Sequence, residues 1–441
     1  MIAHTDDAQL QRLLTLVSPR VGVIRSFSKI VRGIEEPSPP IMYQATLSHH
    51  DYRLAPPEER IAAGKGLTDE DAMRAAFGEA IEHYCAAQVD EETSRMAKWA
   101  DLGGPAISPP EFVLYSEAQY AQKNFSHHRW QEDDVVTWSP VRELPGDREI
   151  LAPTSLVFLT SSMARAEDQF TFSTSNGLAA GPTLEFAILN GLCELVERDG
   201  FLITWMNKLP APQVDFSGLG GLAENIKTHY DTYGTELRVF NVSTDLPIYV
   251  MMCIGLDKTG VGPAAMVGLG CNLDPRAALL KSVLEVCQMH PGETQRFKNE
   301  PPEKRLQRYE DVLTLYDHSA FLMVPERLNE FSFLLDNGRQ QSIHDLPNFS
   351  QGNVAADLNT CVNSLVEAGC RVAYADLTTS DIVDFGVRVV RAIATGLQPM
   401  HFGFGEERLG GHRLFEVTHK LGYAAEIRTE KDLNPCPHPL A

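Results

Sequence analysis

The sequence is short of positive charge. Its 441 residues include 38 lysines and arginines against 59 aspartates and glutamates, which gives a formal net charge of −21. Because no basic patch can dominate such a surface, the charge argues against nucleic acid as the main partner. The excess of carboxylates suits a protein that holds divalent cations, although an ordinary solvated surface accounts for most of these charges equally well.

Zinc-type cysteine spacing and membrane-spanning runs are also missing. The eight cysteines form no CxxC and no zinc-binding pattern. No signal peptide is visible, and no apolar run is long enough to cross a bilayer. These absences predict a cytoplasmic protein with reduced thiols, most of them buried, and no membrane partner.

The familiar nucleotide-binding loops are absent too. The small-residue stretch SNGLAAG, residues 175–181, lacks the GK[ST] ending of a Walker A loop, and its glycines do not follow GxGxxG. Small residues ahead of a helix let backbone amides approach a phosphate, so both an anion-binding loop and an ordinary tight turn remain open. The segment AGKG, residues 63–66, contains Lys65 and is a weaker example of the same pattern.

What the chain does contain is a succession of helices and strands that predicts an α+β fold with helices packed on sheets. Thr68 with three acids after it indicates the start of a helix that runs to about Gln88. Irregular structure is expected at 35–40, 55–59, 293–309 and the proline-rich end, and irregular connections with one or two short elements are expected at 105–148. Further helices are expected at 10–17, 274–290 and 357–369, and strands at 41–48, 150–159, 237–243, 248–255, 264–271, 371–377 and 387–394.

Three of the expected helices share a pattern of acidic residues. Aligned on the first glutamate, the segments AAFGEAIEH, GLCELVER and SVLEVCQ each place two oxygen-bearing side chains about one turn apart, so both project from one helix face. Such a face can hold one hard cation together with the phosphates of a nucleotide. The residues concerned are Glu79, Glu82, Glu194, Glu197, Glu285 and Gln288.

A solvated helix face is the alternative interpretation of each pair. Apolar neighbours such as Phe77, Ile81 and Leu195 leave little room for a broad polar face, which favours acids that point inward. Buried acids repel one another, and metal ions bound with a nucleotide would remove that repulsion.

Two cations and one further acid lie near these pairs. Arg198 follows Glu194 by four residues, and Lys281 precedes Glu285 by four, so each forms either a helix ion pair or a phosphate contact. Glu185 precedes Glu194 by nine residues, about two and a half turns, and would face the opposite way on a straight helix. It contributes to the same site only if the helix starts later or bends.

Together these stretches resemble the YcaO family of ATP-utilising proteins, in particular its azoline-forming cyclodehydratases. From about Gly64 onward the motifs follow in the order of that branch. They are GKG, the first acid-pair helix, TSNGLAAG with LCELVERDGF and TWMNKLPAP, the pair Asp317 and His318, TGLQPMHFG with RLGGHRL, and the proline-rich end. The resemblance implies a YcaO-type ATP-binding fold, with an N-terminal extension over residues 1–60, a catalytic domain over 61–430 and a tail over 431–441.

The resemblance implies that ATP is bound through Mg²⁺ ions held by the helical glutamates. The sequence departs from the family pattern at His83 and Lys281, where arginines are common, and at Ala76 and Gly191, where serines are usual. The implied metal ligands are Glu79, Glu82, Glu194, Glu197 and Glu285, and the implied nucleotide contacts are Lys65, Arg198, Lys281, Gln288 and Glu185.

In that family a PxPxP tail reaches back into the active site, and here Pro435, Pro437 and Pro439 supply the spacing. Related tails end in PHPFP and this one ends in PHPLA, so the motif also aligns on Pro437, Pro439 and Ala441. The second alignment makes the terminal carboxylate of Ala441 a positioning group or base. Prolines pre-set an extended backbone, so little entropy is lost when such a tail inserts.

The resemblance implies an ATP-dependent peptide cyclodehydratase that converts Cys, Ser or Thr of a ribosomal precursor peptide to thiazoline or oxazoline. Thioamide formation from external sulfide and a non-catalytic peptide-binding scaffold are the alternatives. No leader-peptide-binding segment is visible ahead of AGKG, so we expect a separate partner that resembles ubiquitin-activating enzymes. A flavin dehydrogenase and a second copy of the chain are further partners that the resemblance allows.

Overall fold

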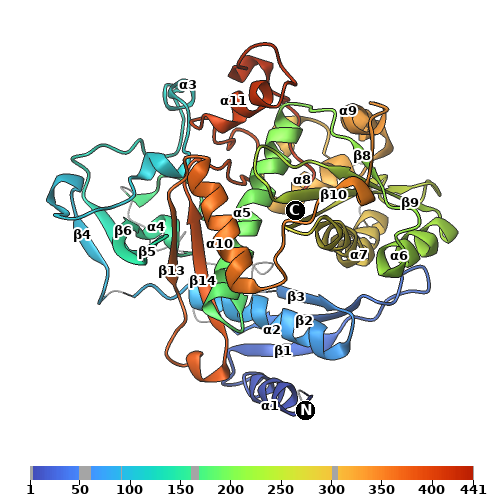
Figure 1. The fold of residues 1–441 in the computed structure, drawn as a ribbon, viewed down its shortest axis with the longest axis horizontal. Coiled ribbons are helices and arrows are strands. Elements are labelled where there is room, and N and C mark those ends of the chain that lie inside the picture. Colours follow the sequence, from blue (N-terminus) through green and yellow to red (C-terminus); the bar gives the residue numbers. More distant parts are fainter. Residues whose placement is uncertain (1–2, 49–60, 91, 160–167, 300–305, 441) are drawn as a thin grey trace. The chain divides into compact units, whose positions relative to one another are not determined.

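The computed structural model describes residues 3–48, 61–90, 92–159, 168–299 and 306–440 of the chain (Figure 1). The chain forms two compact units, and each is assembled from separate segments. Helix α5 (Leu184–Met206) begins in unit 1 and ends in unit 2. Among the described residues, no helix is long and apolar enough to span a membrane. Unit 1 comprises Met1–Val31, Pro39–Leu192 and Val354–Thr395, and unit 2 comprises Arg32–Ser38, Cys193–Asn353 and Gly396–Ala441.

Unit 1 contains two sheets. Besides the start of α5, its helices and strands are α1 (Ala3–Leu14), β1 (Ile24–Lys29), β2 (Ile41–Leu47), β3 (Ile61–Gly66), α2 (Asp69–Ala86), β4 (Arg95–Ala97), α3 (Glu117–Tyr120), β5 (Val136–Leu144), β6 (Arg148–Pro153), α4 (Thr154–Val157), β7 (Leu178–Gly181), α10 (Val354–Glu367), β13 (Val372–Asp376) and β14 (Arg388–Ala394). One sheet has the order β1–β2–β3, and α2 packs on β2 and β3. The other has six strands in the order β4–β5–β13–β14–β7, with β6 paired to β5.

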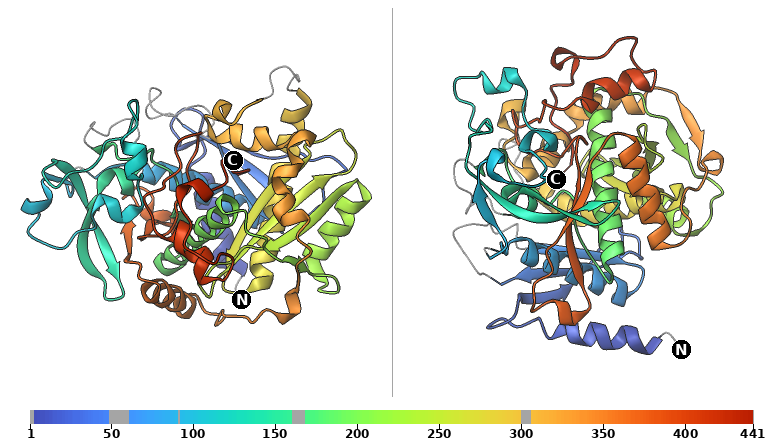
Figure 2. Two further views of the ribbon diagram at one scale, coloured as in Figure 1. Left: turned by 90° about the horizontal axis from the view of Figure 1, so that it is seen from above. Right: turned by 60° about the vertical axis from the view of Figure 1, so that its left-hand side comes forward.

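Unit 2 contains one five-stranded sheet. After the end of α5, its elements are β8 (Gln213–Asp215), α6 (Gly221–Thr232), β9 (Thr235–Asn241), β10 (Tyr249–Asp257), β11 (Ala265–Asn272), α7 (Pro275–Asn299), α8 (Leu315–Leu322), α9 (Ser332–Leu335), β12 (Gln340–Ser342) and α11 (Arg413–Lys420). The strand order is β11–β10–β9–β8–β12, and only the β8–β12 pair is parallel. Helix α7 packs on β10 and β11 (Figure 2), and this contact forms much of the apolar core of the unit.

An arrangement of three strands followed by a helix occurs twice in the chain. In unit 1, β1, β2 and β3 form an antiparallel sheet that leads into α2. In unit 2, β9, β10 and β11 do the same and lead into α7. The equivalence extends to single residues. The carboxylate of Glu79 accepts a hydrogen bond from the amide of Ala63, and that of Glu285 accepts one from Leu269, both at 3.2 Å and across 16 residues.

A glycine brings helix and strand close together in each copy. A Cβ at Gly64 on β3 would lie 2.0 Å from the amide nitrogen of Ala76 on α2. A Cβ at Gly270 on β11 would lie 2.5 Å from the amide nitrogen of Ser282 on α7. Each glycine precedes its helix partner by the same number of residues. The absence of a side chain at these two positions lets a helical carboxylate reach a strand amide.

The start of α2 illustrates how local sequence sets these elements. Thr68 caps the helix, because its side-chain oxygen accepts a hydrogen bond from the amide of Asp71 at 3.1 Å. Acids in the first turn then complement the helix dipole. The opposite face is apolar, and Phe77 and Ile81 are fully buried. The helix therefore has one face for the core of unit 1 and a separate stripe for its acids.

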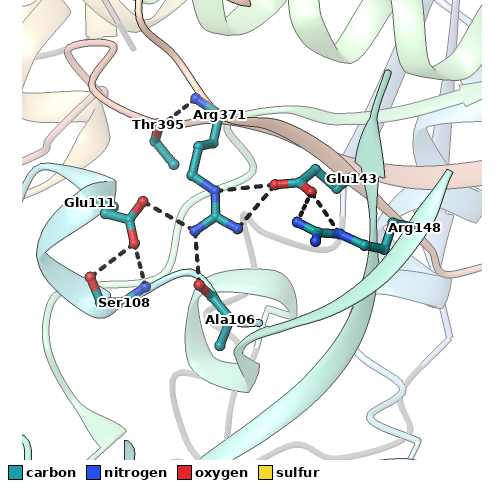
Figure 3. A network of polar contacts seen from close by, with 7 residues as sticks. All are labelled: Ala106, Ser108, Glu111, Glu143, Arg148, Arg371 and Thr395. Atoms are coloured by element: carbon teal, nitrogen blue, oxygen red, sulfur yellow. Dashed lines mark hydrogen bonds and ion pairs between the residues drawn. The ribbon is translucent and has the colours of Figure 1, made fainter. Parts of the chain in front are cut away.

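Arg371, directly before β13, ties the six-stranded sheet to the chain around residues 106–111 (Figure 3). Its Nη2 donates to Glu143 on β5 at 3.0 Å, and its Nη1 donates to the carbonyl oxygen of Ala106 at 2.8 Å. Glu111 lies 3.4 Å from Nη1, and Arg148 on β6 donates to the same Glu143. Every member belongs to unit 1, and we assign the network to the stability of that unit.

The predicted α+β fold with helices packed on sheets is confirmed. Thr68 begins α2 as predicted, and the helix ends at Ala86. The strands predicted at 41–48, 237–243, 248–255, 264–271, 371–377 and 387–394 are present within a few residues of the predicted bounds. The helices predicted at 10–17, 274–290 and 357–369 are present too, although α1 begins earlier than predicted and α7 ends later.

Other predictions of local structure are wrong. Residues 105–148 contain the nine-residue strand β5, and the strand predicted at 150–159 ends at Pro153, where α4 follows. The charged stretch 293–309 is helical up to Asn299. Residues 63–66 and 178–181 belong to paired strands, because pairing with β2 and β14 overrides the low strand propensity of Gly and Ala. The break predicted at 55–59 lies outside the described residues.

Candidate functional site

The acidic face of α5 lies in unit 2 and carries three charged residues in adjacent turns. Arg198 Nη2 lies 3.5 Å from Glu194 Oε1, four residues earlier, and 3.7 Å from Glu197 Oε1. These side chains are largely buried, with 25% of Glu194, 12% of Glu197 and 20% of Arg198 exposed. The predicted helix ion pair of Arg198 is therefore present, and one guanidinium serves two carboxylates.

Glu285 on α7 belongs to the same electrostatic cluster. Burial raises the pKa of the Glu197 carboxyl to about 8; Arg198 and Lys281 oppose this rise, and Glu285 and Glu194 add to it. Burial by itself would lower the pKa of the Arg198 guanidinium, but Glu197, Glu194 and Glu285 together raise it. Three carboxyl groups thus share two cations in a poorly solvated part of unit 2, and below about pH 8 the Glu197 carboxyl holds a proton.

The residues of α7 in this cluster are held by the neighbouring strand. Glu285 Oε2 accepts the amide hydrogen of Leu269 on β11 at 3.2 Å. Lys281 is exposed, and its Nζ donates to the carbonyl oxygen of Cys271 at 3.3 Å. Gln288, one turn after Glu285, is half-buried. The structure therefore brings the predicted Glu194–Glu197 pair of α5 and Glu285 of α7 together in unit 2.

The remaining predicted polar residues belong to unit 1. Glu79 and Glu82 on α2 are half-buried, and Glu79 Oε2 accepts the amide hydrogen of Ala63 on β3 at 3.2 Å. Lys65 lies on β3 and is half-buried. Glu185 lies in the first turn of α5 and is exposed. At least Glu79 thus points toward the sheet of its own unit and does not belong to a fully solvated helix face.

The repeat gives the pairs of α2 and α7 equivalent places. Because Glu79 and Glu285 bind strand amides in the same way, Glu82 and Gln288, three residues later, occupy matching positions. One copy offers two carboxylates, and the other offers a carboxylate and an amide. The two stripes are alike in geometry and different in charge.

The donor set suits magnesium bound together with a nucleotide. Within the described ranges, no group of three His, Cys, Asp or Glu side chains lies close enough to hold a metal ion by itself. Mg²⁺ needs no such cage, because one or two carboxylates and the phosphate oxygens of a nucleotide satisfy it. The raised pKa of Glu197 agrees with this, since added positive charge would relieve its repulsion with Glu194 and Glu285.

The proline-rich segment Asn434–Leu440, which we call the tail, packs against the end of α5. The indole N–H of Trp205 donates to the carbonyl oxygen of Cys436 at 2.9 Å. The amide of Asn434 donates to the carbonyl oxygen of Met206 at 2.7 Å. Neither helix nor strand forms in the tail, as predicted from its prolines.

The tail residues predicted from the resemblance have different environments. Pro437 and Pro439 are buried, whereas Pro435 is exposed. Ala441 lies outside the described residues. Which of the two proline alignments operates therefore stays a prediction.

Two buried histidines, His318 and His401, contact the buried His438 of the tail. The ring of His318 on α8 stacks on that of His438, with 4.0 Å between ring centroids and 21° between planes. The ring of His401 meets His438 edge-on at 4.9 Å. The amide of Gly403 donates to His318 Nε2 at 2.9 Å, and His318 Nδ1 lies 2.9 Å from the carbonyl oxygen of His438. The motif pair Asp317 and His318 pointed to this position, but not to its contact with the tail.

A buried ion-pair network beside the acidic face was not predicted. Asp199, the residue after Arg198, is fully buried and pairs with Arg413 on α11 at 2.7 Å. Its other oxygen accepts the amide hydrogen of Gln398 at 2.8 Å. Arg413 also pairs with Asp245 at 2.8 Å. The sequence signals were the ERD and RLGGHRL segments, which supply Asp199 and Arg413.

Comparison with solved structures finds the same fold. A heterocyclase solved in complex with substrate and cofactor matches 99% of this chain with a TM-score of 0.83 and 29% sequence identity. This chain spans 57% of the length of that heterocyclase. YcaO from Methanopyrus kandleri, solved with AMPPCP and Mg²⁺, matches 89% of this chain and 91% of its own length, with a TM-score of 0.66. At 21% identity that likeness shows the fold alone.

Sequence comparison places the chain in a class of ATP- and Mg²⁺-binding enzymes. Residues 63–398 match the family described as YcaO cyclodehydratase, ATP- and Mg²⁺-binding. The match covers well over half of the chain, and the chain belongs to the YcaO family. An uncharacterized protein of Methanothermobacter thermautotrophicus is 27% identical over 360 residues, which cover 79% of this chain and 84% of that protein. ATP and Mg²⁺ are therefore its cofactors.

Proposed function

We propose that this protein is an ATP-dependent peptide cyclodehydratase, which converts Cys, Ser or Thr of a ribosomal precursor peptide to thiazoline or oxazoline. The observation that carries the proposal is the cluster of Glu194, Glu197 and Glu285 around Arg198, in a chain whose family binds ATP and Mg²⁺. The 29% identity to a heterocyclase across nearly the whole chain supports the same reaction class.

In the proposed reaction, the thiol or hydroxyl of the substrate side chain attacks the preceding backbone carbonyl carbon. A C–S or C–O bond forms, the nucleophile loses its proton, and the carbonyl oxygen becomes an oxyanion. This oxygen takes the γ-phosphoryl group of ATP, and ADP is released. The C–O bond to phosphate then breaks as the former amide nitrogen loses its proton and forms the C=N bond. The products are azoline peptide, ADP and phosphate.

We assign the acidic residues to the nucleotide end of this reaction. Glu194, Glu197 and Glu285 offer carboxylate oxygens to Mg²⁺, and Arg198 is placed beside them with a guanidinium that fits phosphate oxygens. Bound Mg²⁺ would neutralise charge that builds on the transferring phosphoryl group. Lys281 and Gln288 extend the same face of α7, where they can contact the nucleotide.

Residues of unit 1 receive the same kind of role. Glu79 and Glu82 are proposed as metal ligands. The equivalence of α2 with α7 supports this, because Glu79 and Glu285 each accept a hydrogen bond from the amide of the strand residue 16 positions earlier. Lys65 and Glu185 are proposed as nucleotide contacts on the resemblance to the family. The tail, with Pro437 and Pro439 buried in unit 2, is proposed to order the substrate amide.

We also propose that the substrate is presented by another protein. This part of the proposal rests on the resemblance to the azoline-forming branch of the family. A leader-peptide-binding partner that resembles ubiquitin-activating enzymes would supply peptide recognition, and a flavin dehydrogenase would oxidise azoline to azole. Titration of a candidate partner against the initial rate of product formation tests the first point, and full activity of the chain alone contradicts it.

The reaction is tested by mass spectrometry of a candidate precursor peptide after incubation with the protein, ATP and Mg²⁺. The expected product has lost the mass of one water per ring, with one ADP formed for each. Glu194→Gln should abolish product, whereas Glu416→Gln, an exposed acid on α11 with 58% of its side chain accessible, should not change the rate. ATP hydrolysis without mass loss contradicts the cyclodehydratase assignment.

The same assay separates the two alternatives. A peptide whose mass rises by the exchange of oxygen for sulfur, only when sulfide is added, would identify a thioamide synthase. Peptide binding without ATP hydrolysis, unchanged by Glu194→Gln, would identify a scaffold.

A further inference from the structure

The tail is held by burial and by a small set of hydrogen bonds. Residues 436–440 are buried, and Asn434 and His438 donate to carbonyl groups outside the tail. Proline has no N–H, so three of the seven residues of the tail donate no backbone hydrogen bond. Among the described residues, two side chains from outside the tail donate to its carbonyl groups, Trp205 at Cys436 and His318 at His438, both at 2.9 Å. Each of these two contacts fixes a different carbonyl of the tail.

The contacts of His318 fix one tautomer of its ring. The amide of Gly403 can only donate, so the Nε2 that it reaches must be unprotonated. The carbonyl oxygen of His438 can only accept, so Nδ1 must carry the proton and donate it. A neutral ring with its hydrogen on Nδ1 satisfies both. Burial lowers the pKa of His318 to about 4, with the bond to His438 opposing the fall, so the ring keeps this state at neutral pH.

The held residue, His438, reaches back toward the acidic face of α5. Its Nε2 lies 2.7 Å from the carbonyl oxygen of His401 and donates to it, and its ring lies over that of His318. Burial lowers the pKa of His438 well below its ordinary value, His318 and His401 add to this, and Arg198 contributes as well. The ring of His438 also meets that of Phe201 on α5 edge-on, with 5.9 Å between centroids, and Phe201 lies three residues after Arg198. This contact places His438 against the helix that carries Arg198.

We propose that His318 is a positioning residue for the reaction, a latch that holds the tail against α8 through one hydrogen bond to the carbonyl of His438 and the stacking of the two rings. Part of this inference, the effect on turnover, rests on the proposed function. The latch itself does not, because docking of the tail can be measured without any reaction.

Cys436 provides that measurement. Its thiol is buried in the docked tail, and burial raises its pKa to about 12, so alkylation by iodoacetamide is slow until the tail leaves. His318→Gln places an amide oxygen near the position of Nε2 and keeps the bond from Gly403, but loses the bond to the tail. His318→Asn places an amide nitrogen near the position of Nδ1 and keeps the bond to the tail. The two variants are matched in chemistry and differ in which contact survives.

We expect His318→Gln and His318→Phe to raise the alkylation rate of Cys436 about tenfold, the effect of one lost hydrogen bond on the docked population. His318→Asn should stay near wild type. His229→Phe, a half-buried histidine that packs on Tyr233, is the control and should change nothing. Peptide mapping reports each cysteine separately, and the other seven serve as internal references for global unfolding.

Turnover is then compared in the full chain and in a chain ended after Leu433. His318→Gln should lower kcat for azoline formation and leave the KM for ATP unchanged, and it should have no further effect once the tail is removed. Equal alkylation of Cys436 in all variants overturns the latch. A further loss of kcat in the shortened chain overturns action through the tail. If wild type forms no azoline, the proposed function has failed while the alkylation result still decides on the latch.

Discussion

Asp199, which is fully buried, forms an ion pair with Arg413, with 2.7 Å between Oδ2 and Nη2, one residue after the acidic face of α5 ends. Arg413 also reaches Asp245 at 2.8 Å, so its guanidinium contacts two carboxylates that have almost no access to water. Asp199 in turn fixes the amide of Gln398. The network joins α5, α11 and the segment ahead of α11 within unit 2, and it holds the helix that presents Arg198.

Arg413→Met should therefore be severely destabilising. The change leaves the fully buried Asp199 without its cation and leaves Asp245 with Lys420 alone. The loss of one partner of a buried pair lowers the free energy of unfolding by about 3–5 kcal/mol. Lys420→Met is the control, because Lys420 pairs with the same Asp245 at 2.6 Å but is 64% exposed, and should cost less than about 1 kcal/mol. Urea unfolding measures both. Equal losses in the two variants would show that burial does not set the strength of the network.

The same network predicts a decline in stability in acid. Burial alone would raise the pKa of Asp245, but hydrogen bonds from Arg413 and Lys420 lower it to about 2. The unfolded carboxyl titrates at about 3.9. Because the folded pKa is the lower one, the stabilisation is complete above about pH 4 and is lost as the pH falls toward 2. Asp245→Asn should be less stable than wild type near neutral pH, and the difference should shrink by about pH 2. A constant difference across this range would contradict the assignment.

The close approach of helix and strand in both copies of the repeat can be tested at its glycines. In Gly64→Ala and in Gly270→Ala the new Cβ meets helix backbone within about 2.5 Å, which cannot rotate away, so each should lower the free energy of unfolding by about 1–3 kcal/mol. Gly78→Ala, on α2 itself, meets nothing nearer than 3.8 Å and should stabilise by about 0.5–1 kcal/mol. Opposite signs in one unfolding assay support the repeat; destabilisation by Gly78→Ala as well would contradict it.

Helix caps and the spacing of side chains along a helix could be predicted from the sequence, because they depend on residues that are neighbours in the chain. The cap at Thr68 and the spacing of Glu194 and Glu197 on α5 need only neighbours in sequence, and the structure contains both features. Strand β7 was not predictable in the same way, since three of its four residues are Ala or Gly, which are depleted in strands, and it forms by pairing with β14. The sequence showed only the helical part of the repeat, because the two helices align on Glu79 and Glu285. The equivalence of the preceding strands became clear from the hydrogen bonds that their amides donate to these two glutamates.

The parts of the site that were missed depend on contacts between distant residues. His318 and His438 are 120 residues apart, and Asp199 and Arg413 are 214 apart. Neither pair has a periodicity or spacing that a single sequence can show. The composition also gave no sign that Arg198 would sit among three carboxylates, because the joining of α5 and α7 is a property of the packed sheet and its helices.

Glu197→Gln should show whether the acidic cluster serves to bind Mg²⁺ with the nucleotide or to stabilise the fold. The raised pKa of Glu197 already keeps its carboxyl protonated at neutral pH, so the amide of Glu197→Gln, which has the same shape, leaves the nucleotide-free protein about as stable as wild type. Binding of Mg²⁺ with AMPPCP, measured by the rise in Tm, should weaken at least about tenfold, since one of the carboxylates proposed to hold Mg²⁺ is lost. Wild type should show about 2.7 kcal/mol of stabilisation at a ligand concentration of 100 Kd. Glu416→Gln should match wild type in both measurements. A Glu197→Gln protein that is less stable without nucleotide but binds Mg²⁺ and AMPPCP normally would identify the cluster as a structural ion-pair network.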